Sequence, residues 1–272
     1  MLFLIQQIVV LIGSLIGGLF DLKTGYIYDW ITYPVIVAGV ILSYFSGYLL
    51  ESLGIAAAIL GIGYLLYYTG KLGGGDVKLF LGLSLALPFI QDKPFIVLVL
   101  FYSAIAGVLV IGSYYSIKYI LKGIELEQIK QNLVKAVLLA IALIIYFGFM
   151  FSMNLLSLLG VLLLGIPLAI GLIFMVFERG IREKCFLKWI TKKQLEEDET
   201  IAFDFLNEKQ IKKLKLGQKR VFDKKDFALF EKAGLKKIPV YRNLPRFGIF
   251  IFIGCLLAIL VPDLFKIIYL IG

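Results

Sequence analysis

Residues 136–177 read AVLLAIALIIYFGFMFSMNLLSLLGVLLLGIPLAIGLIFMVF, which is forty-two positions without a charged side chain. One helix needs about 20 apolar residues to cross the hydrocarbon core of a bilayer, so this stretch has about twice the length of one span. The triplet Ser152-Met153-Asn154 interrupts it. We therefore predict two membrane spans that are joined near this triplet.

Other apolar runs, bounded by charged or turn residues, predict six more spans. They cover residues 2–20, 30–50, 52–70, 79–91, 94–117 and 247–261. Since the chain is also 60% hydrophobic with a mean hydropathy of +0.93, we expect an all-α, polytopic membrane protein of about eight spans. The first run has no Lys or Arg before it, so we keep it as a span rather than a cleaved signal peptide.

The positive charge of the chain lies almost entirely in residues 178–246. This window holds 19 Lys or Arg against 11 Asp or Glu, a net charge of +8, whereas the whole chain carries +9. Cytoplasmic loops carry an excess of Lys and Arg. Alternating eight spans then puts 26 of the 28 basic residues on the cytoplasmic side. We predict a membrane-embedded core (1–177), a basic cytoplasmic segment (178–246) and a C-terminal span (247–272).

The basic segment shows no pattern of a DNA- or RNA-binding module, so we expect no nucleic-acid partner. Helix start and stop residues predict two short helices in it, at about 207–216 and 223–233. The residue types of the whole chain restrict its chemistry further. It has no histidine and only two cysteines, Cys185 and Cys255, which argues against a Ser-His-Asp or Cys-His mechanism and a metal site. We expect no cofactor, and carboxylates are the natural candidates for catalysis.

Two of these carboxylates, 55 positions apart, lie at one membrane margin in this arrangement. Asp21 closes the first span and Asp76 opens the fourth, both on the cytoplasmic side. Acids at the edge of a span are costly and tend to be functional. Two carboxylates at one depth can share a proton, so that one activates water and the other acts as an acid. Gly73, Gly74 and Gly75 would let the backbone leave helical geometry and let a substrate strand approach.

Each acid also has a structural interpretation. Asp76 can be the N-cap of its helix, since it follows glycines and precedes an apolar run. Asp29, before Trp30, can be the N-cap of the second span. Asp21 can be an interfacial acid beside Lys23. None of these interpretations explains the shared depth of Asp21 and Asp76.

The residues around both acids resemble a known family. Residues 73–76, GGGD, fit the GxGD motif of intramembrane aspartic proteases. Residues 73–79, GGGDVKL, are similar to the second-aspartate region of the prepilin and archaeal preflagellin peptidases. Residues 21–23, DLK, followed by 27–29, IYD, are similar to the first-aspartate region of the same family. The resemblance covers residues 1–120, with Tyr28 standing where many bacterial relatives have proline.

The resemblance implies an intramembrane aspartic endopeptidase with Asp21 and Asp76 as its catalytic pair. Such enzymes remove short basic class III signal peptides from preflagellin or type IV prepilin-like precursors, cutting after glycine at the cytoplasmic face of the cell membrane. No Cys-x-x-Cys pair is present, so the resemblance implies no N-methyltransferase activity. The supporting motif residues are Gly73, Gly74, Gly75, Lys78, Lys23 and Asp29.

Two other functions share some of these features. Glycine-interrupted spans with intramembrane acids also occur in ion-coupled transporters, although no inverted repeat is visible here. A membrane scaffold without catalysis is the second alternative. In it, Asp21 and Asp76 would only stabilise helix ends.

Overall fold

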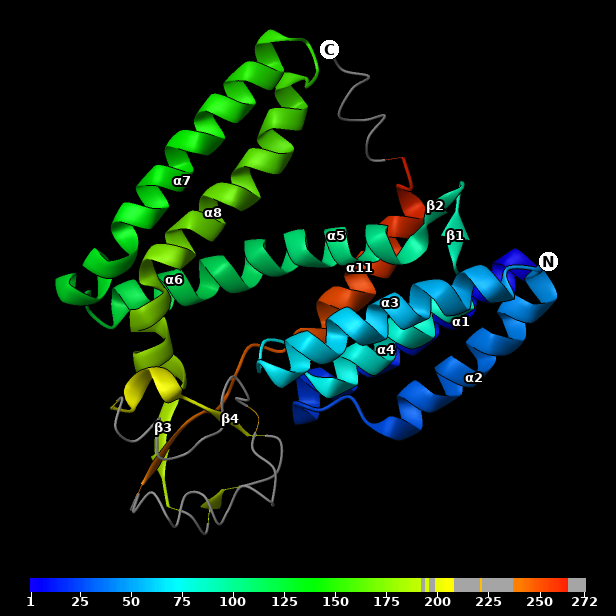
Figure 1. Ribbon diagram of the computed structural model, residues 1–272, viewed down its shortest axis with the longest axis horizontal. Helices are drawn as coiled ribbons and strands as arrows, with labels where there is room; N and C mark the ends of the chain where they lie inside the picture. The colour runs from blue at the N-terminus through cyan, green and yellow to red at the C-terminus, as the bar shows by residue number, and fades with distance from the viewer. Residues whose placement is uncertain (192–193, 196–198, 208–220, 222–236, 264–272) are drawn as a thin grey trace. The chain divides into compact units, whose positions relative to one another are not determined.

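The computed structural model describes residues 1–191, 194–195, 199–207, 221 and 237–263. The chain forms two compact units, each built from two separate parts of the sequence (Figure 1). Unit 1 contains Met1–Pro88 and Phe186–Gly248, and unit 2 contains Phe89–Cys185 and Ile249–Gly272. Both predicted acids therefore belong to unit 1.

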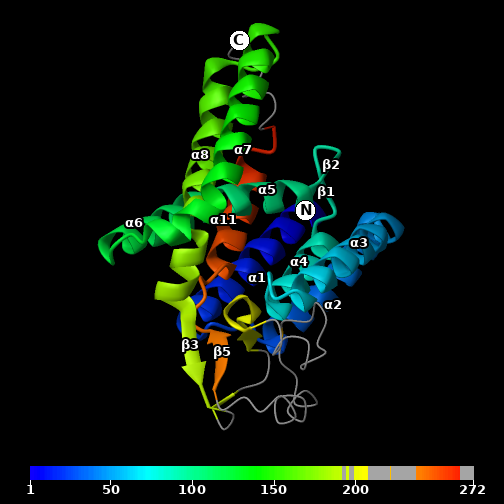
Figure 2. The same cartoon turned by 60° about the vertical axis from the view of Figure 1, so that its left-hand side comes forward.

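Four helices that lie side by side form the membrane part of unit 1 (Figures 1 and 2). They are α1 (Leu2–Thr24), α2 (Asp29–Ser46), α3 (Leu49–Tyr68) and α4 (Gly74–Ala86). α1 and α2 each end at a glycine in the left-handed conformation, Gly25 with φ 82° and Gly47 with φ 80°. Such a glycine stops a helix because it can adopt positive φ without a steric penalty.

The helix α4 is short and packs against α1, α2 and α3. Its 13 residues correspond to about 20 Å at 1.5 Å per residue. Buried residues lie on every side of it, which is typical of a helix enclosed by others. The predicted bounds of 79–91 are wrong at both ends. α4 begins earlier, at Gly74, and stops before Pro88, after which residues 89–94 form a hairpin.

A small antiparallel sheet, which the sequence did not predict, completes unit 1. Its strands are β3 (Leu187–Ile190), β4 (Thr200–Ile201) and β5 (Ile238–Tyr241), in the order β3-β5-β4. The central strand β5 is buried along its whole length. A short 3₁₀ turn, Phe203–Phe205, follows β4. The two helices predicted at 207–216 and 223–233 fall on positions outside the described residues, apart from Asn207.

Unit 2 is built mainly from helices. They are α5 (Phe95–Gly107), the π-helical η1 (Val108–Gly112), α6 (Ser113–Leu121), α7 (Leu126–Ser152), α8 (Leu158–Ile181), the π-helical η2 (Arg182–Phe186) and α11 (Gly248–Leu260). A hairpin of β1 (Phe89–Ile90) and β2 (Lys93–Pro94) precedes α5. The predicted break at 152–154 is confirmed, because α7 ends at Ser152 and Asn154 has a positive φ of 53°.

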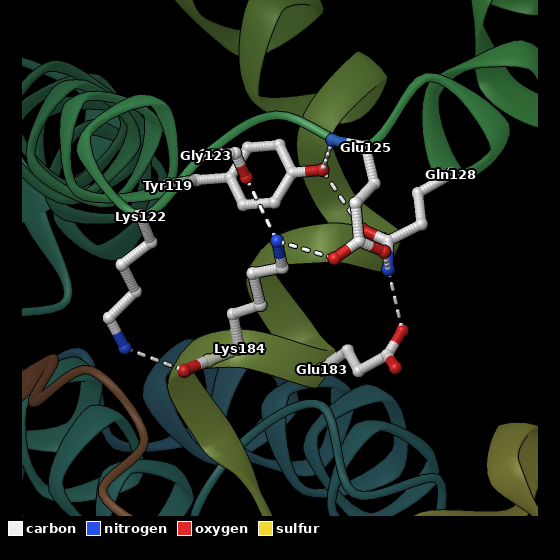
Figure 3. Close-up of polar contacts among 7 residues, drawn as sticks. All are labelled: Tyr119, Lys122, Gly123, Glu125, Gln128, Glu183 and Lys184. Carbon is white, nitrogen blue, oxygen red and sulfur yellow. Dashed lines mark hydrogen bonds and ion pairs between the residues drawn. The ribbon is translucent and has the colours of Figure 1, made fainter.

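A network of polar side chains joins η2, which follows α8, to the turn between α6 and α7 (Figure 3). The buried Tyr119 donates a hydrogen bond to Gln128, which donates to Glu125 and Glu183. Lys184 pairs with Glu125. Gly180 leaves room for the ring of Tyr119, because a Cβ there would lie 2.3 Å from ring carbons. The network thus satisfies the side chain of Gln128, one of the polar residues that unit 2 buries.

Among the residues that the structure describes, six helices are long and apolar enough to cross a membrane. They are Leu2–Thr24, Asp29–Ser46, Leu49–Tyr68, Phe95–Leu121, Asn132–Ser152 and Leu158–Phe186. The fourth and eighth predicted spans correspond to α4 and α11, which have 13 residues each in the described part of the chain. The predicted fold class, a polytopic bundle of membrane helices, is confirmed.

Candidate functional site

The helices α1 and α4 touch through small residues and run antiparallel. Gly17 of α1 lies against Leu79 of α4, since a Cβ at Gly17 would be 3.1 Å from that side chain. One turn away from this contact, Val35 of α2 lies against both Gly13 of α1 and Gly82 of α4. Residues earlier in the sequence of α1 thus lie beside residues later in the sequence of α4. The C-terminal end of α1 therefore meets the N-terminal end of α4.

This crossing brings Asp21 and Asp76 to the same end of unit 1. Asp21 is four residues after Gly17 and Asp76 is three residues before Leu79, so each lies about one helical turn beyond the contact. The charge of Asp21 acts on Asp76, which places the two carboxyl groups within electrostatic reach. Asp21 is buried and Asp76 is half-buried.

Asp76 is fixed by the beginning of its own helix. α4 has Gly73 as its N-cap, so Asp76 is the third helical residue and not the N-cap that the sequence allowed. Its Oδ2 accepts a hydrogen bond from the N–H of Gly73 at 3.2 Å. This contact is the carboxylate half of a capping box, which satisfies one of the unpaired N–H groups at a helix start.

The glycines before Asp76 do not interrupt a helix, which corrects the expectation that all three leave helical geometry. Gly74 and Gly75 form the first turn of α4. Gly75 is needed for close packing instead, because a Cβ there would lie 2.6 Å from the carbonyl oxygen of Ile27. The same Ile27 lies beside Gly17, at 3.6 Å from a Cβ built there. Gly75 thus lets α4 reach the loop that follows Asp21.

Asp21 is fixed by a remote segment. We call residues 242–248 the strap, because they lead from β5 to the end of α1. The N–H of Gly248 donates a hydrogen bond of 2.8 Å to Oδ2 of Asp21. The guanidinium of Arg246 donates to the backbone carbonyls of Asp21 and Leu22, both at 2.7 Å. The strap therefore contacts both the carboxyl group and the backbone of Asp21.

Sequence reasoning missed Arg246 and Gly248. One signal for them existed, because the charge pattern that placed Asp21 at the cytoplasmic margin also placed the end of the basic segment there. That signal predicts the membrane depth of Arg246 and Gly248. It does not predict which residues they contact at this depth. Only the folded chain brings Arg246 beside the end of α1.

Asp29 and Lys78, two further motif residues, pair with each other. Lys78 forms an ion pair and hydrogen bond with Asp29 and lies over the ring of Tyr33, 5.3 Å from its centroid. Asp29 is the first residue of α2 and Tyr28 is its N-cap, so the predicted capping role of Asp29 is wrong. Its carboxylate ties α2 to α4 instead. The remaining motif residue, Lys23, is exposed in the last turn of α1.

The residue types at this end of unit 1 limit its chemistry. In the described part of the chain, no three His, Cys, Asp or Glu side chains gather as ligands for a metal ion. What the arrangement offers is a pair of carboxyl groups, both shielded from solvent to some degree. Such a pair can hold one shared proton and can perform general acid and general base catalysis together.

A comparison with known protein families identifies the part of the chain that carries both aspartates. Residues 8–112 match the model of the type IV leader peptidase family. No curated protein and no solved structure matches the chain. The family match confirms the resemblance to prepilin and preflagellin peptidases. The match concerns residues 8–112 alone, and the long apolar helices indicate a multi-pass membrane protein.

Proposed function

We propose that this chain, with the type IV leader peptidase region at residues 8–112, is an intramembrane aspartic endopeptidase. Asp21 and Asp76 are its catalytic pair. The substrates are preflagellin or type IV prepilin-like precursors, from which it removes the short basic leader before the hydrophobic stem. The reaction uses no cofactor and includes no N-methylation of the product.

The observation that carries this proposal is the meeting of α1 and α4. Gly17, Gly75 and Ile27 bring the end of one helix and the start of another together, and each end carries one acid. The interpretation of both acids as simple helix-end residues accounts for the bond from Gly73 to Asp76. It does not account for two carboxyl groups within electrostatic reach in the same unit, since like charges disfavour each other.

The pair can hydrolyse a peptide bond when it holds a single proton. The ionised carboxylate takes a proton from water, whose oxygen attacks the carbonyl carbon of the scissile bond. The protonated carboxyl group gives its proton to the carbonyl oxygen, which forms a tetrahedral intermediate. The carboxyl group that took the proton from water then gives it to the leaving amine as the C–N bond breaks. A hydroxyl group of the intermediate gives its proton to the other carboxylate, which restores the singly protonated pair.

Aromatic side chains support a position of the pair at the membrane margin. The loop after α1 and the start of α2 expose Tyr26, Tyr28, Trp30 and Tyr33. Trp and Tyr are enriched where a membrane meets water. Asp21 lies in the last turn of α1, just before this group. A margin position gives the pair access to water, which hydrolysis requires and the hydrocarbon core lacks.

The charge distribution supports the cytoplasmic side. Single cysteines at the exposed positions Asp92 and Lys237, in a chain with Cys185 and Cys255 replaced, would test it. In sealed cells or oriented vesicles, a membrane-impermeant maleimide should label position 237 only from the cytoplasmic side and position 92 only from the outside. Labelling of both positions from one side would contradict this orientation.

The transporter alternative is less well supported. It depended on glycines that break a span, whereas Gly74 and Gly75 lie within the regular first turn of α4. The family match also concerns a peptidase. Coupled ion flux that is lost in both Asp21→Asn and Asp76→Asn, with precursor cleavage unaffected, would favour the transporter.

The test of the proposed function is precursor cleavage by the purified protein. A panel of preflagellin and prepilin-like precursors is incubated with the enzyme, and mass spectrometry determines the new N-terminus. We expect a cut that leaves glycine at the end of the leader. Asp21→Asn and Asp76→Asn should abolish cleavage with little loss of stability, since Asn keeps the size of the side chain but cannot exchange the proton.

Asp29→Asn is the matched control, because Asp29 is an acid at the same end of unit 1. Its ion pair with Lys78 is largely exposed, and such pairs contribute about 0–1 kcal/mol to stability. Activity should remain within tenfold of the wild type, which corresponds to roughly 1.4 kcal/mol. Normal cleavage by either Asp21→Asn or Asp76→Asn would end the aspartic peptidase proposal.

A further inference from the structure

We infer that the strap, residues 242–248, positions Asp21 for catalysis, with Arg246 and Gly248 as its positioning residues. This inference rests on the proposed function. The strap lies well beyond residues 8–112, which match the peptidase family. The catalytic site would then be completed by a part of the chain that the family region does not contain.

The hydrogen bond from Gly248 is the most direct contact. It fixes Oδ2 of Asp21 at 2.8 Å from a backbone N–H, and thereby sets the rotation of the carboxyl group. The N–H of Phe247 and the positive charge of Arg246 also act on this carboxyl group. Preorganised donors of this kind need no reorganisation during a reaction. A catalytic carboxylate needs this fixed orientation, because proton transfer requires hydrogen-bond geometry.

The fit between the strap and α1 requires glycine at position 248. A Cβ there would lie 2.9 Å from Cβ of Asp21 and 3.2 Å from Cα of Gly18. Both distances are shorter than packed carbon atoms tolerate without a shift. Any larger residue except proline would push the strap away from Asp21 while keeping the backbone N–H group at position 248. Gly248→Ala therefore changes the distance without removing the donor.

Arg246 holds the backbone at the same place. The last carbonyls of a helix have no partner within the helix, and a basic side chain at this end is favourable. Arg246 donates to two of these carbonyls, and Gly25 donates to one of the same two, that of Asp21, at 2.8 Å. Position 21 is thus fixed through its backbone as well as its side chain.

The strap itself has a defined shape. Asn243 has a φ of 57°, in the left-handed region that Asn tolerates, and Pro245 restricts the backbone just before Arg246. At its base, Arg242 pairs with Glu199 and donates to the carbonyl of Gln194. The strap continues from β5, the buried central strand of the sheet. These features fix the position of the strap, and the strap can therefore fix the position of Asp21.

The experiment compares Gly248→Ala, Arg246→Gln and Arg246→Lys with the wild type. Lys237→Gln, which removes one exposed basic charge from the same segment, is the matched control. We expect Gly248→Ala to lower kcat by about 100-fold with little change in KM, because a displacement of about 1 Å can cost that much. Arg246→Gln should lower kcat by about tenfold, Arg246→Lys by less, and Lys237→Gln should resemble the wild type.

An infrared measurement separates positioning from a merely structural role. In protein with ¹³C-labelled aspartate, the carboxyl band that disappears in Asp21→Asn belongs to Asp21. This band should shift in Gly248→Ala and Arg246→Gln and stay unchanged in Lys237→Gln. A purely stabilising strap would change the melting temperature without changing this band in the folded protein.

The outcomes distinguish the two proposals. If Asp21→Asn cleaves normally, the proposed function fails, while the infrared band still tests the strap. A second outcome is that Asp21→Asn is inactive, whereas Gly248→Ala and Arg246→Gln fold and keep the wild-type kcat. The strap inference is then wrong. A higher KM with unchanged kcat would also overturn it. If Gly248→Ala and Arg246→Gln do not fold, Arg246→Lys decides by the same criteria, since Lys keeps the charge and one donor.

Discussion

Asp76 and Asp21 lie at the same end of unit 1, but they are held in opposite ways. Asp76 is held within one helical turn by the N–H of Gly73, whereas Asp21 is held by Gly248, 227 positions away in the chain. The first contact depends on helix geometry alone. The second depends on the sheet, the strap and the whole of unit 1. The difference indicates that the two acids respond to different kinds of mutation.

An effect as large as that of Gly248→Ala is expected from Gly75→Ala. The added methyl group would meet the carbonyl oxygen of Ile27 at 2.6 Å, so α4 must move away from the loop after Asp21. The bond between Gly73 and Asp76 would survive because it lies within α4. We expect cleavage to fall by about 100-fold, as for a displacement of about 1 Å.

Gly61→Ala is the matched control for this substitution. Gly61 lies in α3, and no atom is found within 4 Å of a Cβ built there. Initial cleavage rates and melting temperatures of both variants should be compared. Equal rates for Gly75→Ala and Gly61→Ala would show that the close approach of α4 to Ile27 does not matter for activity.

A smaller effect is expected from deleting residues 196–237. This deletion tests whether the strap can position Asp21 without the rest of the basic segment. The deletion removes β4 and Glu199 but leaves β3, β5, Arg246 and Gly248. Because Ile190 pairs with Ile238, residues 191–195 can join the two strands as a five-residue hairpin loop, a common length. We expect cleavage within about tenfold of the wild type, roughly 1.4 kcal/mol.

Steady-state cleavage of a precursor by the folded deletion variant checks this expectation. Its KM also reports whether the basic segment contributes to substrate choice. Complete loss of cleavage in a folded deletion variant would mean that the removed residues are needed for the chemistry. The strap alone would then not account for the contribution of the basic segment.

The sequence predicted those features that follow from local patterns. One polar triplet predicted the break between α7 and α8. The alternation of spans and the charge distribution predicted that Asp21 and Asp76 lie at the same end of their helices' bundle. The start of α4 was misplaced, because the glycines suggested a break while packing against Ile27 keeps Gly74 and Gly75 helical. The sequence also allows Asp29 as an N-cap, because its distant partner Lys78 gives no local signal.

The strap and the sheet could not be predicted in this way. The strands β3 and β5 have four residues each and pair across a long charged segment. The contact of Arg246 with Asp21 joins a loop to a helix end and produces no periodic pattern. Contacts of this kind depend on the folded chain, and the Asp21 half of the candidate site was therefore only partly visible in the sequence.

The most direct test of the central claim is a double-mutant cycle on the two acids. Cleavage by Asp21→Asn, Asp76→Asn and the double variant is measured with one precursor in an assay sensitive to slow rates. If the pair acts as one catalytic group, each single variant should lose about 10⁴-fold in rate, on the scale of a damaged catalytic triad. The double variant should then be no slower than either. A double loss equal to the product of two modest single losses would mean that the acids act independently and would contradict the shared pair.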